Sequence, residues 1–330
     1  MSGARQLALS VRALTKRYDV TTAVENVSFT VAFGTTAALV GPPGAGKTTI
    51  LRVLLGLTSA TSGTASVAGP TAAGSAPGHA VGGVLAPRGL HPARTARDHL
   101  RIYAAAASVA AARVLEVLEM VDLRAAAATK IGAMSLGQQT RLALATALLG
   151  DPALLVLDEP MNGLDTAESA WLRDFLREHS RRGGSALLSS ESLAAVLPGA
   201  DSLIVLNEGT VIYEGSPARL RRGHPDRLVV AASSPIALAT MLAARGFTDA
   251  VIRTDGRLAV AEATEPQIRA AAAAAHVRLD SIIPDQIHPD RVLASLTKPT
   301  AAPAPRYPGP PAPVGVANQQ PSPMPYGISR

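Results

Sequence analysis

The sequence predicts an α/β core followed by a small α+β domain, and three observations support this. Apolar segments with strand character alternate with segments of helical spacing over the first two thirds of the chain. A glycine-rich segment lies between a predicted strand and a predicted helix. From residue 227 the order changes to βαββαβ, which is the ferredoxin-like order.

Near-alternating apolar residues over 7–18 and 23–33, with a break at Gly34, predict an antiparallel β layer at the start of the chain. Short apolar runs predict strands at 36–40, 81–85, 154–157 and 185–189, and a hairpin at 202–213. Helical spacing predicts helices at 47–57, most of 95–120, 136–149 and 166–180. Glycine, alanine, proline and serine dominate 70–80, which predicts a loop.

In the second part, the predicted order is strand 227–231, helix 235–244, strand 248–253, strand 257–261, helix 265–275 and strand 277–283. We therefore expect a first domain over 1–223 and a small α+β domain over 224–297. Proline and alanine dominate 298–330 without periodicity, so we expect a disordered tail there.

Composition excludes several classes of protein. With 47% apolar and 17% charged residues the chain is typical of a globular protein, and no apolar stretch is long enough to span a membrane. The amino end has no secretion-signal pattern, and the absence of cysteine agrees with a reducing compartment, so we expect a cytoplasmic protein. The net charge of +6 is scattered, which argues against nucleic acid as a partner.

The glycine-rich segment has the spacing of a phosphate-binding loop. It comprises Gly41, Pro42, Pro43, Gly44, Ala45, Gly46, Lys47 and Thr48, followed by Thr49. Glycines allow a tight turn whose N–H groups point at phosphate oxygens, assisted by the positive end of the following helix. Lys47 would reach the outer phosphates, and the Thr48 hydroxyl would ligate Mg²⁺. The loop predicts a nucleotide-binding protein.

Two acids end the apolar run at 154–157. Asp158 is expected to join the Mg²⁺ shell, and Glu159 to polarise the attacking water as a general base. Paired acids at a strand end can also be a solvated cap, an interpretation that the preceding loop disfavours.

A third motif lies between the loop and the acids, at Ser135, Leu136, Gly137 and Gln138. It resembles the Leu-Ser-Gly-Gly-Gln signature of the ABC ATPase family, and Ser135 could equally be a helix cap. The order of loop, signature and acid pair, followed by 162–165 in the place of the family's D-loop, carries a resemblance over residues 6–222. The chain resembles ATPases of actinobacterial-type antibiotic and multidrug exporters.

This resemblance implies an ABC ATPase core with a mixed sheet, an antiparallel β layer and a helical subdomain. It implies that MgATP lies between the loop of one subunit and Ser135–Gln138 of a second ABC subunit, with Tyr18 stacking on adenine. An amphipathic strand is the structural alternative for Tyr18. Separate transmembrane permease subunits would hold the ATPase at the inner face of the membrane, and export is implied by resemblance alone.

Two positions depart from the family pattern. Ala86 replaces a glutamine that senses Mg²⁺ and water, and Glu191 replaces a histidine that contacts the γ-phosphate. A carboxylate about 4 Å from a phosphate oxygen would repel it by roughly 4 kcal/mol at an effective dielectric near 20. We expect MgATP binding with slow hydrolysis, unless relatives of this branch tolerate both substitutions.

Three alternatives to a transport ATPase remain. A hydrolysis-impaired subunit could act as the nucleotide-binding regulatory partner of an active ATPase. A soluble ABC ATPase acting on ribosomes or DNA would usually carry two cores or a coiled-coil insertion, and neither is present. A GTPase or kinase is disfavoured, because no Asn-Lys-x-Asp guanine motif follows the phosphate loop in this sequence. His91, His99 and His179 are expected on the surface without metal-ligand spacing.

Overall fold

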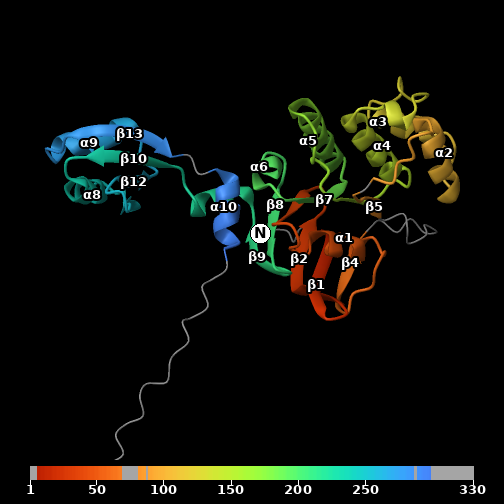
Figure 1. Ribbon diagram of the computed structural model, residues 1–330, viewed down its shortest axis with the longest axis horizontal. Coiled ribbons are helices and arrows are strands. Elements are labelled where there is room, and N and C mark those ends of the chain that lie inside the picture. Colours follow the sequence, from red (N-terminus) through yellow and green to blue (C-terminus); the bar gives the residue numbers. More distant parts are fainter. Residues whose placement is uncertain (1–5, 69–80, 87, 286–287, 299–330) are drawn as a thin grey trace, which may run out of the picture. The chain divides into compact units, whose positions relative to one another are not determined.

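The computed structural model describes residues 6–68, 81–86, 88–285 and 288–298 (Figure 1). Its central element is a six-stranded sheet in the order β5-β6-β7-β3-β8-β9. These strands are β3 (Thr36–Val40), β5 (Val81–Val84), β6 (Leu154–Leu157), β7 (Ser185–Ser190), β8 (Ser202–Asn207) and β9 (Thr210–Gly215). All neighbours pair in parallel except β8 and β9. The sheet is mixed, as expected.

The central strands are continuous apolar runs because they are covered on both faces. Every residue of β3, β6 and β7 is buried. Parallel strands end at the same edge of a sheet, so the segments that follow β3, β6 and β7 meet there. These segments are the phosphate loop, the acid pair and the stretch around Glu191.

A three-stranded antiparallel sheet packs on one side of this core. It contains β1 (Leu7–Tyr18), β2 (Thr21–Ala32) and β4 (Ser62–Val67) in the order β2-β1-β4. The first two strands were predicted; β4 was not, because Ser-Gly-Thr-Ala-Ser-Val is small, largely exposed and without apolar alternation. Side chains of this sheet share one hydrophobic cluster with β3, β6 and helix α1 (Lys47–Leu54).

Further helices pack on the central sheet or on one another. They are α2 (Ala96–Ala106), α3 (Arg113–Met120), α4 (Leu136–Leu148), α5 (Thr166–Arg181), α6 (Leu193–Val196) and α7 (Pro217–Gly223), with a 3-10 turn at Ile131–Ala133. The helix expected over most of 95–120 is interrupted at Ser108, whose φ is +55°. Helix α1 ends before the predicted residue 57 because Gly56 has a φ of +69°. Residues of α2, α3, α4 and α5 share one core cluster.

The second part forms its own sheet in the order β11-β12-β10-β13. The strands are β10 (Arg227–Ala232), β11 (Ala250–Ile252), β12 (Leu258–Ala261) and β13 (Leu279–Asp285), and all pairs are antiparallel. Helices α8 (Pro235–Ala244) and α9 (Glu265–Ala274) share a separate hydrophobic cluster with the sheet. The predicted ferredoxin-like order is present.

One further helix, α10 (Pro289–Leu296), was not predicted. Its Val292 and Leu293 are 6% exposed and belong to the same cluster as α4 and α5, not to the cluster of the small sheet. The expected division at residue 223 stays a prediction, and the predicted loop at 70–80 and tail at 298–330 lie almost wholly outside the described residues. Within the described part of the chain, no helix is long and apolar enough to cross a membrane.

Candidate nucleotide site

The phosphate loop turns directly from β3 into α1. Gly44 and Gly46 have φ values of +78° and +95°, a conformation that a side chain would strain. Gly46 lies against the start of β2, where an added Cβ would come 2.6 Å from the carbonyl oxygen of Ala23. Helix α1 has no side-chain cap, so the N–H groups of its first turn have no partner among the described residues. They form a cradle for an anion.

Lys47 is 6% exposed and folds back over the loop. Its ammonium donates to the carbonyl oxygens of Gly41, at 2.8 Å, and Pro42, at 3.1 Å. It also lies 3.6 Å from Glu159 Oε1 and 3.9 Å from Glu191 Oε1. The loop, the acid pair and the Glu191 segment therefore meet at one ammonium, as their strand order requires.

Thr48 and Asp158 meet across the end of the sheet. The Thr48 hydroxyl donates to both Asp158 carboxylate oxygens, at 3.2 and 3.0 Å. Ser189 Oγ, which the sequence analysis did not single out, donates to Asp158 Oδ1 at 2.6 Å and accepts from the Glu159 N–H at 2.8 Å. The sequence signal for Ser189 is a pair of serines at the end of a buried apolar strand. That strand neighbours the one that carries the two acids. Ser189 fixes the orientation of both acids.

Glu159 has the environment expected of a general base. Its φ is +46°, and its Oε1 is buried without a hydrogen-bond donor among the described residues. Burial raises the pKa of Glu159, and the charges of Glu191 and Asp158 act in the same direction. Lys47 and the hydrogen bond from the Glu191 N–H oppose this increase in pKa. A raised pKa makes this carboxylate a better proton acceptor near neutral pH.

Glu191 lies at the site, beside both the Lys47 ammonium and the Glu159 carboxylate. Its side chain is 53% exposed, and its N–H donates to Glu159 Oε2 at 3.3 Å. Lys47 provides the cationic neighbour that lessens the repulsion between the two carboxylates. Ala86 is exposed just beyond β5, and the Asp158 N–H donates to the Val84 carbonyl at 2.8 Å, so this position lies at the same sheet edge. A methyl group there can make no hydrogen bond.

The signature residues lie in another place. Ser135 caps α4 in a capping box with Gln138, so the structural interpretation of this serine is correct. An added Cβ at Gly137 would overlap the Glu168 side chain, and one at Gly163 would come 2.8 Å from Leu136 Cδ2. Among the described residues, no hydrogen bond or ion pair joins Ser135–Gln138 to the phosphate loop. The signature therefore packs against the D-loop of its own chain.

Tyr18 ends β1 and is 42% exposed, with the Lys16 ammonium 4.7 Å from its ring centre. Lys16 lies over one face of this partly exposed ring, so adenine could stack on Tyr18 only against its other face or after Lys16 moves. The expectation for His99 was wrong, because it is 1% exposed and packs 4.7 Å from the Tyr103 ring. Burial, with the charge of Arg94, lowers the pKa of His99. No three His, Asp or Glu side chains gather as a metal site in the described residues.

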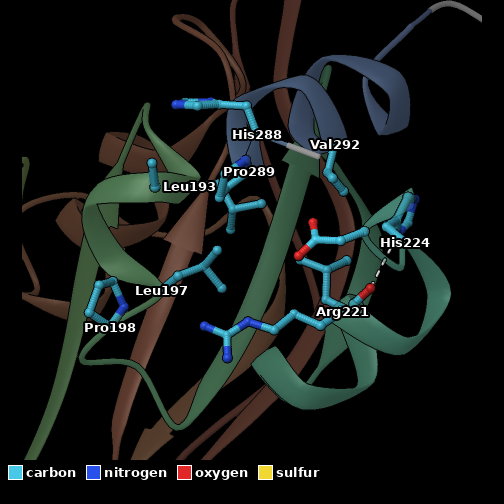
Figure 2. A pocket seen from close by; sticks show the side chains of 11 residues that line it. Leu193, Leu197, Pro198, Arg221, His224, His288, Pro289 and Val292 are labelled. Carbon is cyan, nitrogen blue, oxygen red and sulfur yellow. Dashed lines mark hydrogen bonds between the residues drawn. The ribbon is translucent and has the colours of Figure 1, made fainter. Parts of the chain in front are cut away.

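A cavity of about 560 Å³ lies away from all these motifs (Figure 2). It is bounded by α6, α7 and α10, and none of its lining residues belongs to the loop, the acid pair or the signature. The nucleotide site is therefore identified by its hydrogen-bonding groups and not by the volume of a pocket.

Comparison with known proteins agrees with this geometry. The family model described as ABC transporter matches residues 24–162. The Nod factor export ATP-binding protein I of Burkholderia lata is 38% identical over 219 residues, covering 64% of this chain and 72% of the relative. The chain belongs to the ABC transporter ATP-binding subunits. A sulfate/thiosulfate import ATP-binding protein of Chromobacterium violaceum is 34% identical, over 67% of this chain and 62% of the relative.

Solved structures of ABC proteins share the fold. An ATP-binding subunit of an ABC transporter is 28% identical, with a TM-score of 0.57, over 66% of this chain and 92% of that structure. A dimeric ATP-binding cassette bound to ADP and phosphate is 23% identical, with a TM-score of 0.56, over 63% of this chain and 98% of that structure, and at this identity it shows the fold alone. As a member of the ABC ATPase family, this subunit is an ATP-hydrolysing protein.

The residues of this ABC subunit fit MgATP. The free N–H groups of the α1 first turn suit phosphate oxygens, and the buried Glu159 Oε1, which accepts no hydrogen bond from the described residues, suits a water molecule. The paired Thr48 hydroxyl and Asp158 carboxylate suit Mg²⁺, which usually takes one or two carboxylates together with substrate phosphates.

Proposed function

We propose that this ABC subunit binds MgATP and drives export through separate membrane permeases. The observation that carries the proposal is the meeting of Lys47, Thr48, Asp158 and Glu159 at the edge where the parallel strands end. Bound Mg²⁺ would neutralise phosphate charge. The first-turn N–H groups would hold the phosphates, Lys47 would neutralise the outer ones, and Thr48 and Asp158 would hold the ion.

In this proposal Glu159 accepts the proton of the attacking water at Oε1. Its backbone is held by Ser189, and its other oxygen by the Glu191 N–H, so its carboxylate is oriented before substrate arrives. A positioned general base contributes about 10²–10⁴ to a rate.

A second copy or a related ABC subunit would supply Ser135–Gln138. The separation of the signature from the phosphate loop within one chain supports this, because each chain then carries two half-sites. Export is favoured over import because the Nod factor export protein is 38% identical and the sulfate/thiosulfate import protein 34%, and permease partners would hold the protein at the inner face of the membrane. The division into 1–223, 224–297 and a tail over 298–330 is part of the proposal.

The Glu159→Gln variant tests the catalytic assignment. Glutamine keeps the shape of glutamate but cannot accept the proton, so phosphate release should fall at least about 100-fold. MgATP affinity, measured by calorimetry, should stay within a few-fold of the unchanged protein. The matched control is Glu178→Gln, a surface acid paired with Arg181 and Arg182. Unaltered turnover in Glu159→Gln would rule out this role.

We also propose that Glu191 slows hydrolysis in this subunit. Its carboxylate stands beside Lys47, where an imidazole could donate a hydrogen bond to phosphate instead of repelling it. Glu191→His should therefore raise turnover, by about tenfold or more, when phosphate release is followed at saturating MgATP. No gain in turnover would count against an inhibitory Glu191. It would favour an active site adapted to that carboxylate.

A further inference from the structure

Helix α10 delivers a carboxylate to the segment that follows Glu191. Asp290 accepts a hydrogen bond from Ser192 Oγ, at 3.1 Å to Oδ1 and 3.2 Å to Oδ2. Its Oδ1 also accepts from the Ala194 N–H at 3.2 Å. These contacts join residues almost one hundred positions apart, and none involves a motif of the family.

The segment that Asp290 holds leads directly into the nucleotide site. Ser192 caps α6, with its Oγ accepting from the Ala195 N–H at 3.2 Å, and Ser190 Oγ accepts from the Ser192 N–H at 3.1 Å. Glu191 lies between these two serines, and its own N–H reaches Glu159 Oε2. The backbone of Glu191 is thus one residue from the Asp290 anchor and one hydrogen bond from the proposed general base.

Apolar packing fixes α10, and Asp290 adds polar contacts to α6, whose Leu193 and Val196 are buried in the same core. Val292 and Leu293 are buried in the core, and the Asn207 side chain donates to the Thr297 carbonyl at 3.3 Å. Figure 2 shows Leu197, just after α6, and Val292 of α10 facing the same hollow. The polar contacts of Asp290 act at the start of α6, where Ser192 and Ala194 lie.

We propose that Asp290 is a positioning residue for ATP hydrolysis: it holds residues 190–194 so that the Glu191 backbone N–H orients Glu159. This rests on the proposed role of Glu159 as general base. The carboxy-terminal helix, which lies beyond the small sheet in sequence, thereby takes part in organising the catalytic carboxylate. A purely structural contact would also hold α6, but its loss would not lower kcat.

The first test needs no nucleotide. In the full-length chain, Asp290→Ala removes the acceptor of the Ala194 N–H, so hydrogen exchange in peptides spanning 191–197 should accelerate about tenfold or more. Ser192→Ala removes the hydroxyl that donates to Asp290 and should also accelerate exchange. Arg291→Ala, an exposed neighbour on the same helix, should leave exchange unchanged. Equal exchange in Asp290→Ala and Arg291→Ala would overturn the proposal.

The second test separates positioning from stability. Asp290→Ala and the milder Asp290→Asn should lower kcat by about three- to tenfold, the range for one hydrogen bond, with a smaller change in KM. A purely structural contact would lower the fraction of folded protein but would leave kcat per folded subunit and KM unchanged. Lys47, Asp158 and Glu191 are the charged groups facing Glu159, and Arg291→Ala touches none of them.

The outcomes are distinct. Accelerated exchange with an unchanged kcat would make Asp290 a purely structural contact and overturn its positioning role. If Asp290→Ala does not fold, Asp290→Asn and Ser192→Ala carry both measurements. If the unchanged protein hydrolyses no ATP, the proposed function fails. Hydrogen exchange would then still show whether Asp290 holds residues 191–197, but the proposal about hydrolysis would fail together with the proposed function.

Discussion

At the scale of single residues, Lys47 connects the parts of the site. Its ammonium is shared by two loop carbonyls and two carboxylates. The loop spacing predicts that Lys47 faces phosphate, and the resemblance predicts that Glu191 does as well. The inward fold of Lys47 onto Gly41 and Pro42 has no sequence signal, because it depends on which acceptors the turn presents.

Glu159 also predicts a pH-dependent stability. Its folded-state pKa is raised, so the folded chain holds this proton more tightly than the unfolded chain does. The free energy of unfolding therefore falls as pH rises from the ordinary glutamate pKa through the raised one, and the penalty is complete above it.

The Glu159→Gln variant removes that penalty. Without nucleotide, it should melt at a higher temperature than the unchanged protein at pH 8, and the difference should vanish at acid pH, where Glu159 is protonated. Thermal melts at several pH values measure this. A lower melting temperature for Glu159→Gln at pH 8 would mean that the Lys47 contact outweighs burial.

At the scale of elements, long buried runs could be predicted and small exposed ones could not. Strands β3 and β6 are wholly buried and match the predicted ranges. Strand β4 and helix α10 were missed, because five of the six β4 residues are exposed and α10 has a single turn of buried residues. Both owe their structure to partners distant in sequence, with β4 pairing to β1 and α10 packing on α6.

Helices α4 and α5 are joined by a contact that sequence alone did not reveal. Arg141 Nε donates to Glu168 at 3.0 Å, and its guanidinium lies 4.0 Å from the Trp171 ring centre. The Trp171 N–H donates to Asp122 at 2.7 Å. This cluster sets the signature helix against the helix that follows the D-loop.

Arg141→Lys keeps the charge but loses the planar stacking and the guanidinium geometry. It should lower the free energy of unfolding by about 1–2 kcal/mol. Urea denaturation followed by fluorescence measures it directly, since Trp171 is the only tryptophan of the chain. The control is Arg182→Lys, because Arg182 is 68% exposed and pairs with Glu178. This substitution should lower the free energy of unfolding by less than about 0.5 kcal/mol. Equal losses of unfolding free energy in the two variants would show that the Arg141 contacts stabilise the fold no more than an exposed ion pair does.

At the scale of the whole molecule, the chain carries both halves of a nucleotide site without joining them. The order of motifs predicts each half, and the fold explains their separation. The signature begins a helix packed on α5, whereas the phosphate loop follows β3. In the proposed function the second half comes from another subunit.

Mixing variants tests whether that subunit can be a second copy. Lys47→Ala breaks the loop, and Gly137→Ala displaces the signature by crowding Glu168. Each variant alone should be inactive, while an equal mixture should recover about a quarter of normal turnover, because half of randomly paired dimers are mixed and hold one intact site. Mixing either with the double variant should recover nothing. A mixture that stays inactive would point to a different ABC subunit as partner.

The ammonium shared by two carboxylates also bears on how tightly ATP can be held. In the free subunit, Lys47 already has two carbonyl and two carboxylate neighbours. In the proposed function, phosphate oxygens compete with these neighbours for the same ammonium, so the contacts that are lost offset part of those that are gained. The free energy of ATP binding that remains for the transport cycle is the difference between the two sets of contacts.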